Sequence, residues 1–171
     1  YANRVWSVDS GNDVVSDTYG ACVPVCIAEG TLIETDGGEV RIEDLTPSHK
    51  IGGHYVRDMT KQYVNTTAEA QKMVEISKDA LGPGVPNEDT FLTDYHMVYH
   101  PMYNNASGVQ ASQMVAGDKI KYVAYNGHVY NVLFDTYEHI RGHNLSLGTL
   151  PPAHKKRWES ILVFGPRQRG R

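Results

Sequence analysis

The sequence predicts an all-β domain that extends from about Cys26 to Leu150. Three observations support this prediction: helical periodicity is poor, short segments alternate apolar with polar residues, and turn signals recur between them. At 171 residues, of which 40% are apolar and 21% charged, the chain is long enough for one domain with its own core. We divide it into an upstream segment (residues 1–25), a β domain (residues 26–152) and a basic C-terminal tail (residues 153–171).

Charge and hydropathy argue against several classes of protein. The net charge of −4 is unlike that of a nucleic-acid-binding chain, and no run of about 18 apolar residues is present that would span a membrane. The sequence contains no phosphate-binding loop, nucleophile elbow or dinucleotide fingerprint, and we predict no cofactor. The chain begins with Tyr1 and shows no signal peptide, which suggests a processed or excerpted part of a longer protein.

A cysteine followed by a β-hairpin opens the predicted domain. After short strands in the upstream segment comes Cys26, and then residues 32–33 and 40–42 are expected to form two strands around an Asp36-Gly37-Gly38 turn, which supplies positive-φ positions. A cysteine at the mouth of a hairpin is well placed to react, although a single cysteine after a valine is more often an inert buried residue. Cys22 is expected to be a small buried residue rather than a disulfide partner of Cys26.

The middle of the chain predicts strands and loops of unequal clarity. Residues 54–72 are polar and Thr-rich, and we assign them to an insertion or connecting loop with a short helical turn at 68–72. Strands are predicted at 73–76 and 91–98, on either side of a tight loop at 81–86.

The last third of the domain predicts a hairpin and a final strand. An Asn126-Gly127 turn is expected to join strands at 123–125 and 129–134, because Asn-Gly between apolar segments is the strongest short-range hairpin signal. A last strand is expected at 145–150, and residues 153–164 are expected to form a helix.

Several of these segments together resemble Hint domains, the autoprocessing module shared by hedgehog proteins and inteins. The order of Cys26, Gly30-Thr31, a strand, a glycine turn and then residues 42–45 is similar to the opening of these domains. Residues 76–86, followed by 93–96, resemble the middle of Hint domains of bacterial and viral proteins. The resemblance implies a horseshoe-shaped fold of two pseudo-symmetric β subdomains.

A repeated spacing fits such a fold. Residues 45–51 and 114–120 share the order of an apolar residue, a two-residue turn, a small residue, a polar residue, lysine and isoleucine. The family prefers Gly-Asp in both copies, and the first copy departs from this pattern with Ser48-His49.

The resemblance also implies a reaction at the Val25–Cys26 peptide bond. In the family the cysteine thiolate attacks the preceding carbonyl to give a thioester, while a Thr-x-x-His pair, here Thr93 and His96, holds and protonates the scissile amide. Such help is needed because a thiol with a pKa of ~8.5 is mostly protonated at neutral pH and an amide nitrogen is a poor leaving group. Thr93 and His96 would point to opposite faces of a regular strand, so their convergence requires a bend. A hydrogen-bonded core histidine is the alternative for His96.

Further polar candidates follow later in the chain. His139 lies close to where the family places a second histidine or aspartate that assists thioester formation, and Asp135 is its neighbour in a turn-like stretch where polar residues are expected in any case. His143-Asn144 resembles the His-Asn end of inteins, but Leu145 follows instead of Cys, Ser or Thr, and full splicing is not expected. No metal is predicted, because two His-x-x-x-His pairs lie outside helices and no cysteine cluster completes a site: His96 with His100, and His139 with His143.

Two functions are therefore weighed. The first is Hint-type autoprocessing, an N-to-S acyl shift that releases the upstream segment, which is the reacting partner. The second is a Hint fold retained as a structural or interaction module of a larger secreted or virion assembly, with little or no cleavage.

After residue 153 the tail holds six of the 16 Lys and Arg residues against one acid, Glu159, which leaves a net charge of about +5. Because apolar residues lie between its basic clusters, we expect the tail to dock on an acidic neighbouring subunit or on the downstream part of the precursor, rather than on nucleic acid or an anionic lipid surface.

Overall fold

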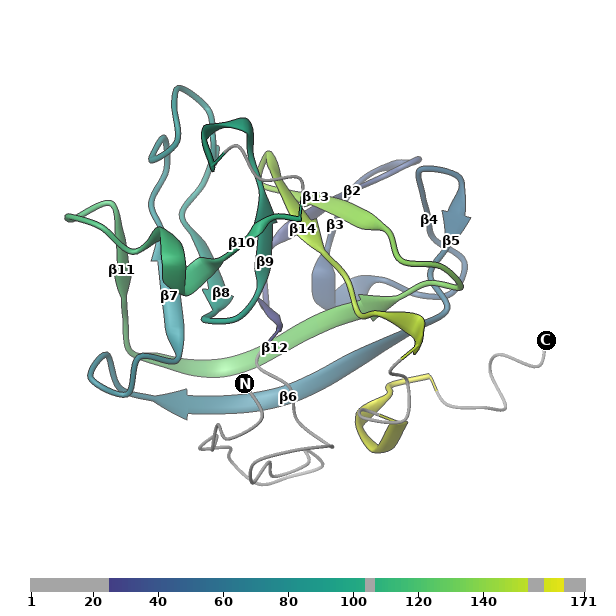
Figure 1. The fold of residues 1–171 in the computed structure, drawn as a ribbon. Helices are drawn as coiled ribbons and strands as arrows, with labels where there is room; N and C mark the ends of the chain where they lie inside the picture. The colour runs from purple at the N-terminus through teal and green to yellow at the C-terminus, as the bar shows by residue number, and fades with distance from the viewer. Residues whose placement is uncertain (1–24, 104–106, 154–158, 165–171) are drawn as a thin grey trace.

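The computed structural model describes residues 25–103, 107–153 and 159–164. These residues form two six-stranded antiparallel sheets and one two-stranded sheet (Figure 1), which confirms the predicted all-β fold. The strands expected in residues 1–24 and most of the basic tail lie outside the described residues. In the described part, no helix has the length and apolarity that crossing a bilayer requires.

The first sheet has the strand order β11-β7-β8-β1-β12-β6. Its longest pairing joins β6 and β12, which are nine residues each. The strands are β1 (Ile27–Ala28), β6 (Asp58–Thr66), β7 (Met73–Ile76), β8 (Thr90–Thr93), β11 (Ile120–Tyr122) and β12 (Tyr125–Leu133).

The second sheet has the order β10-β9-β14-β13-β2-β3, and β4 pairs with β5 alone. Its strands and the small pair are β2 (Leu32–Thr35), β3 (Gly38–Arg41), β9 (Met97–Tyr99), β10 (Val109–Gln110), β13 (His139–Gly142), β14 (Leu145–Gly148), β4 (Lys50–Ile51) and β5 (His54–Tyr55). Short 3₁₀ helices follow several strands: η1 (Ile42–Asp44), η2 (Pro101–Tyr103), η3 (Ala111–Met114) and η5 (Glu159–Ile161).

The main core joins the two sheets. Ile27, Leu92 and Val132 of the first sheet share one buried cluster with Ile33 and Leu147 of the second. Because strand side chains alternate between faces, residues one place along the same strands form a separate buried cluster on the other face of the first sheet. Its members are Cys26, Ala28, Val64, Met73 and Val129.

The predicted opening hairpin is present as β2 and β3. Thr35 pairs with Gly38 across the Asp36-Gly37 turn, and Gly38 has a φ of +120°, a conformation that glycine adopts without steric cost. The Asp36 carboxylate accepts N–H bonds from Gly52 and Gly53 at 2.8 and 2.9 Å, which ties the turn to the loop between β4 and β5.

The assignment of residues 54–72 to an insertion or loop is wrong, because nine of them form β6. Threonine, tyrosine and valine favour strands, and β6 pairs with β12 along its whole length. Its polar composition is misleading because Thr60 and Gln62 are buried and hydrogen-bonded. Residues 68–71 form a turn closed by a bond from Gln71 N–H to the Ala68 carbonyl, not a helix.

The predicted turn at Asn126-Gly127 is also wrong, since β12 runs through both residues. Gly127 leaves room for neighbouring side chains: a Cβ atom there would lie 3.0 Å from the Tyr125 hydroxyl and 3.2 Å from the Glu29 carboxylate. The glycine therefore accommodates a close approach of side chains within a strand. A two-residue turn occurs instead at His143-Asn144, between β13 and β14, where φ is +49° and +68°.

The strand predicted over 91–98 is two strands, β8 and β9, which belong to different sheets. The strand at 73–76, the loop at 81–86 and the strand beginning at 145 are confirmed.

The two copies of the repeated spacing, residues 45–51 and 114–120, have similar local structure. Each copy follows or overlaps a 3₁₀ helix and leads into a strand: η1 precedes β4, and η3 precedes β11. The repeat in sequence is thus matched by a repeat in local structure.

The described part of the tail does not form the helix expected over 153–164. Residues 159–161 make the single 3₁₀ turn η5, after which Leu162 bridges Thr60 at the edge of β6. Ile161 is buried against the domain. Part of the apolar surface that suggested an external partner is therefore covered by the chain's own β domain.

Met59 provides a test of the placement of β6. Its side chain is 2% exposed, so Met59→Ala should lower the free energy of unfolding by about 2–5 kcal/mol, because buried atoms are lost and a cavity remains. Asn65, exposed on the same strand, is the control, and Asn65→Ala should change this free energy by less than about 0.5 kcal/mol. Chemical denaturation measures both values. Equally small effects would contradict the strand.

Candidate active site

The register of the first sheet brings three polar or reactive side chains together. In β1, Ile27 pairs with β8 on one side and with β12 on the other. One residue earlier in both registers, Cys26 lies opposite Thr93 and Asn131. Side chains that are opposite one another on neighbouring strands share a face, so these three lie together on the face away from the main core.

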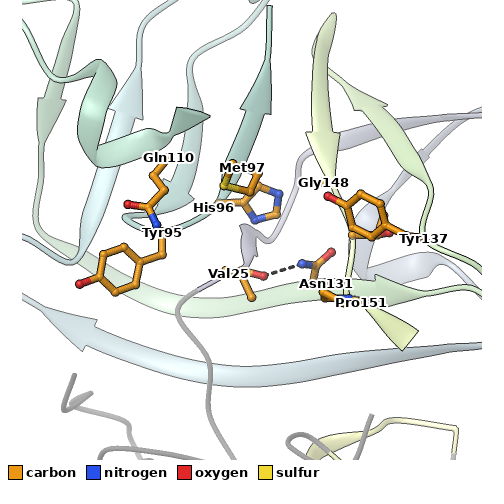
Figure 2. Close-up of a pocket in the computed structure, with 10 residues that line it drawn as sticks. Val25, Tyr95, His96, Met97, Gln110, Asn131, Tyr137, Gly148 and Pro151 are labelled. Carbon is orange, nitrogen blue, oxygen red and sulfur yellow. Dashed lines mark hydrogen bonds between the residues drawn. The ribbon is translucent and has the colours of Figure 1, made fainter. Parts of the chain in front are cut away.

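Side chains hold the peptide bond between Val25 and Cys26 at both ends. Thr93 Oγ1 accepts a hydrogen bond from the Cys26 N–H at 2.6 Å and lies 3.2 Å from the Cys26 carbonyl, to which it donates. Asn131 Nδ2 donates to the Val25 carbonyl at 2.5 Å (Figure 2). The Asn131 amide is itself oriented, because its Oδ1 accepts the Val132 N–H at 2.8 Å. A donor at a carbonyl oxygen stabilises negative charge when a nucleophile adds to that carbonyl.

The thiol of Cys26 is fully buried within the same sheet. It is not half of a disulfide, and Cys22 lies outside the described residues. Gln62 Nε2 of β6 donates to Cys26 Sγ at 3.1 Å. Such a bond strengthens when the sulfur carries a negative charge, so Gln62 stabilises the thiolate of Cys26 relative to the thiol.

His96 reaches the same peptide because the chain turns sharply after β8. The His96 N–H donates to the Thr93 carbonyl at 3.1 Å. The first N–H groups of η3 hold this turn: Ala111 donates to the His96 carbonyl at 2.9 Å, and Ser112 to the Asp94 carbonyl at 2.8 Å. The bend that convergence of Thr93 and His96 requires is therefore present.

The environment of His96 keeps its ring neutral. The side chain is 1% exposed and lines a pocket of about 120 Å³ together with Val25 and Asn131 (Figure 2). Burial lowers the pKa of His96 to about 4, and the backbone carbonyls of Gly148 and Val25, which face the ring, oppose this decrease with a smaller effect. Neither ring nitrogen makes a hydrogen bond of ordinary geometry to another described residue. At neutral pH the ring is therefore unprotonated, and a proton placed on it would be given up readily.

The structure places Asp135 and His139 apart from this peptide. Asp135 is an exposed residue whose carboxylate lies 3.0 Å from Arg57 Nε. His139 stacks on Tyr99, with ring centroids 3.8 Å apart, and contacts the edge of Tyr137. Burial lowers the pKa of His139, and Glu138 partly offsets this. Of His139, Tyr99 and Tyr137, only Tyr137 lines the pocket that contains His96. His139 contacts Tyr137 but does not itself line the pocket.

His143 has a structural role. Its Nε2 accepts the Leu32 N–H at 3.2 Å, and its Nδ1 lies 2.9 Å from Thr90 Oγ1. Asn144 donates to the Gly84 carbonyl at 2.9 Å. Both residues form the tight turn between β13 and β14, which accounts for the His-Asn pair without a splicing step.

Sequence reasoning missed Asn131 and Gln62. Asn131 is a polar residue between Tyr130 and Val132 in an otherwise apolar segment, and a polar group buried in such a strand must be hydrogen-bonded. That pattern could have marked Asn131 as a candidate. Gln62 lay in the segment that was taken for a loop, so its position opposite β12 could not be anticipated.

The fold and this geometry define a class: an all-β domain in which a buried cysteine leads into a central strand and the peptide bond before it is held by threonine and asparagine, with a neutral histidine alongside. A family model described as Hint domain matches residues 25–154, well over half of the chain, and the chain belongs to this family. No curated protein and no solved structure matches it. Membership of the family supports an autoprocessing type of function.

Burial of a neutral His96 should make stability depend on pH. The ordinary histidine pKa of 6.5 applies to the unfolded chain and about 4 to the folded one, so the unfolded chain binds the proton first as pH falls. The free energy of unfolding should therefore decrease from about pH 6.5 to about pH 4, by on the order of 3 kcal/mol. His96→Gln should flatten this decrease, as measured by denaturation at several pH values. Identical slopes for the two proteins would contradict this assignment.

Proposed function

We propose that this domain cleaves its own chain at the Val25–Cys26 bond through an N-to-S acyl shift. The observation that carries the proposal is that both ends of this peptide bond are bound by side chains, Asn131 at the carbonyl oxygen and Thr93 at the amide N–H. Within a sheet, backbone groups ordinarily pair with other backbone groups. Polar side chains at both ends of one peptide bond suit a bond that is to react.

In the first step Cys26 Sγ bonds to the Val25 carbonyl carbon. The thiol proton passes to His96, whose neutral ring lines the pocket at Val25. The electron pair of the carbonyl moves to its oxygen, where the Asn131 Nδ2–H already donates. Removal of one such donor from an acyl-transfer site typically costs about 10²–10³ in rate.

In the second step the carbonyl forms again and the bond from Val25 carbon to Cys26 nitrogen breaks. The nitrogen leaves as an amine with the proton that His96 carries, and a low pKa makes the protonated ring an effective acid. The result is a thioester between Val25 and Cys26 Sγ. Water then adds to the thioester, the carbon–sulfur bond breaks and the sulfur regains a proton, which leaves a Val25 carboxylate and a domain that begins at Cys26.

A second candidate function is a Hint fold retained as a structural module with little cleavage. One observation favours it: Cys26 is 0% exposed and packs among Ala28, Val64 and Val129. A nucleophile that opens the thioester would have to enter through the pocket at Val25.

The two candidates differ in the mass of the purified protein. Self-cleavage predicts a cut between Val25 and Cys26 that dithiothreitol or hydroxylamine accelerates, because both open thioesters. Cys26→Ala should abolish the cut, whereas Cys22→Ala is the matched control and should retain it. Intact mass spectrometry and gels measure the products. A single full-length species that persists under thiol, in a folded sample, would leave only the structural function.

Substitution of His96 or Asn131, the polar side chains beside the Val25–Cys26 bond, should lower the cleavage rate much more than the stability of the fold. His96→Ala should stop cleavage while the free energy of unfolding at pH 7 changes by only about 1–2 kcal/mol. Asn131→Asp keeps the size of the side chain but removes the donor, and should slow thioester formation by about 10²–10³. The control is Asn126→Asp, an exposed asparagine of the same strand, which should cleave at the wild-type rate. Unchanged cleavage in His96→Ala would remove this histidine from the mechanism.

A further inference from the structure

The side chain of Val25 lies in an apolar site that the C-terminal part of the chain helps to build. Val25 packs against a buried cluster of Leu133, Leu150 and Ile161, to which Leu162 also contributes. Leu133 ends β12 and bridges Leu150 after β14, so these two belong to the β domain. Ile161 and Leu162 belong to residues 159–164, which we call the C-terminal strap.

The strap is fixed to the edge of the first sheet. Leu162 bridges Thr60, and the Val163 N–H donates to the Met59 carbonyl at 2.7 Å. The Phe164 N–H donates to Asp58 Oδ1 at 3.0 Å, and Asp58 is fully buried. In Figure 1 the strap, in yellow, lies beside β6. These bonds position Ile161, which is 5% exposed, as part of a defined surface.

The carbonyl and the side chain of Val25 therefore have different environments. The carbonyl accepts a hydrogen bond from Asn131, whereas the side chain packs on the cluster of Leu133, Leu150 and Ile161. A β-branched side chain has few rotamers, so fixing it also fixes the backbone that carries the carbonyl. Displacement of a reacting group by about 1 Å can lower a rate by about 10²-fold, which makes such anchoring relevant to the chemistry.

We infer that the C-terminal strap completes a binding subsite for the side chain of the residue before Cys26, that this subsite selects an apolar β-branched residue, and that it holds the scissile carbonyl against Asn131. Its kinetic part rests on the proposed self-cleavage. The subsite itself is a packing relation that can be measured without any cleavage.

The first test varies residue 25. Val25→Ile should cleave within a few-fold of the wild type, Val25→Ala about 10-fold more slowly because it leaves part of the subsite empty, and Val25→Asp at least about 100-fold more slowly because it places a charge beside Leu150 and Ile161. Rates are followed by intact mass. Equal rates for the isoleucine and aspartate variants would overturn the selectivity.

The second test varies the strap. Ile161→Ala should slow cleavage about 10-fold and Ile161→Val should restore most of the rate. Ile120→Ala is the matched control for lost stability, since Ile120 is also 5% exposed but belongs to the main core. Val163→Ala controls for the strap itself, since the Val163 side chain is exposed (44%) and the substitution keeps the main-chain N–H that binds Met59. Both controls should cleave at the wild-type rate well below their Tm, and an Ile161→Ala rate equal to that of Ile120→Ala would overturn the inference.

A double-mutant cycle separates this inference from the proposed function. In a Cys26→Ala background, which cannot form the thioester, Val25→Ala and Ile161→Ala should interact, and the loss in denaturation midpoint for the double variant should be clearly smaller than the sum of the single losses. Additive losses would show that Val25 does not occupy a site formed by Ile161. If the chain with Cys26 does not cleave at all, the proposed function is wrong and this cycle alone decides the subsite.

Discussion

Two hydrogen bonds at the Val25–Cys26 peptide are the constraint on which the rest of the site depends: Thr93 Oγ1 accepts the Cys26 N–H, and Asn131 Nδ2 donates to the Val25 carbonyl. They exist only if β1 lies between β8 and β12 in one register, because a slip of one residue would turn both side chains to the other face. The apolar pattern fixes that register: Ile27 enters the main core, while Cys26 and Ala28 enter the cluster on the opposite face. The two-residue period that builds the core therefore also aligns the Val25–Cys26 peptide with Thr93 and Asn131.

Placing polar groups at this position has a thermodynamic consequence. Buried amides and hydroxyls destabilise a fold unless they are hydrogen-bonded, and the partners of Asn131 and Gln62 here include the Val25 carbonyl and the Cys26 thiol. His96, buried without an ordinary hydrogen bond to a described residue, adds a group whose protonation the fold opposes. Such an arrangement fits the chemistry proposed for the peptide it surrounds.

The sequence could predict the parts of the site that local signals encode. The Asp36-Gly37 turn and Cys26 lie within one short segment, and Thr93 and His96 are separated by only two residues, so local chemistry and family resemblance were enough. β6 was not predictable in this way, because its pairing with β12 joins residues 59 to 75 positions apart in the sequence and only this tertiary contact shows that a Thr-rich stretch is a strand. Asn131 stands out as a polar residue in an apolar segment, but the sequence does not show which carbonyl it binds. The same limit applies to Asn126-Gly127, where long-range pairing with β6 overrides a strong local turn preference.

In the proposed reaction the substrate is part of the same chain, and this changes what tight binding does. An enzyme with a free substrate gains little rate from contacts that bind substrate and transition state equally, and strong product contacts slow its turnover. A domain that cuts its own chain acts once, so contacts such as those of Val25 with Leu133, Leu150 and Ile161 can hold the bond in place without any later penalty in turnover. After the cut these same contacts, together with the bond from Asn131, would retain the new Val25 carboxylate. In the proposed reaction, cleavage and departure of the upstream segment are therefore separate events, and the C-terminal strap, by contributing to this packing, would influence both.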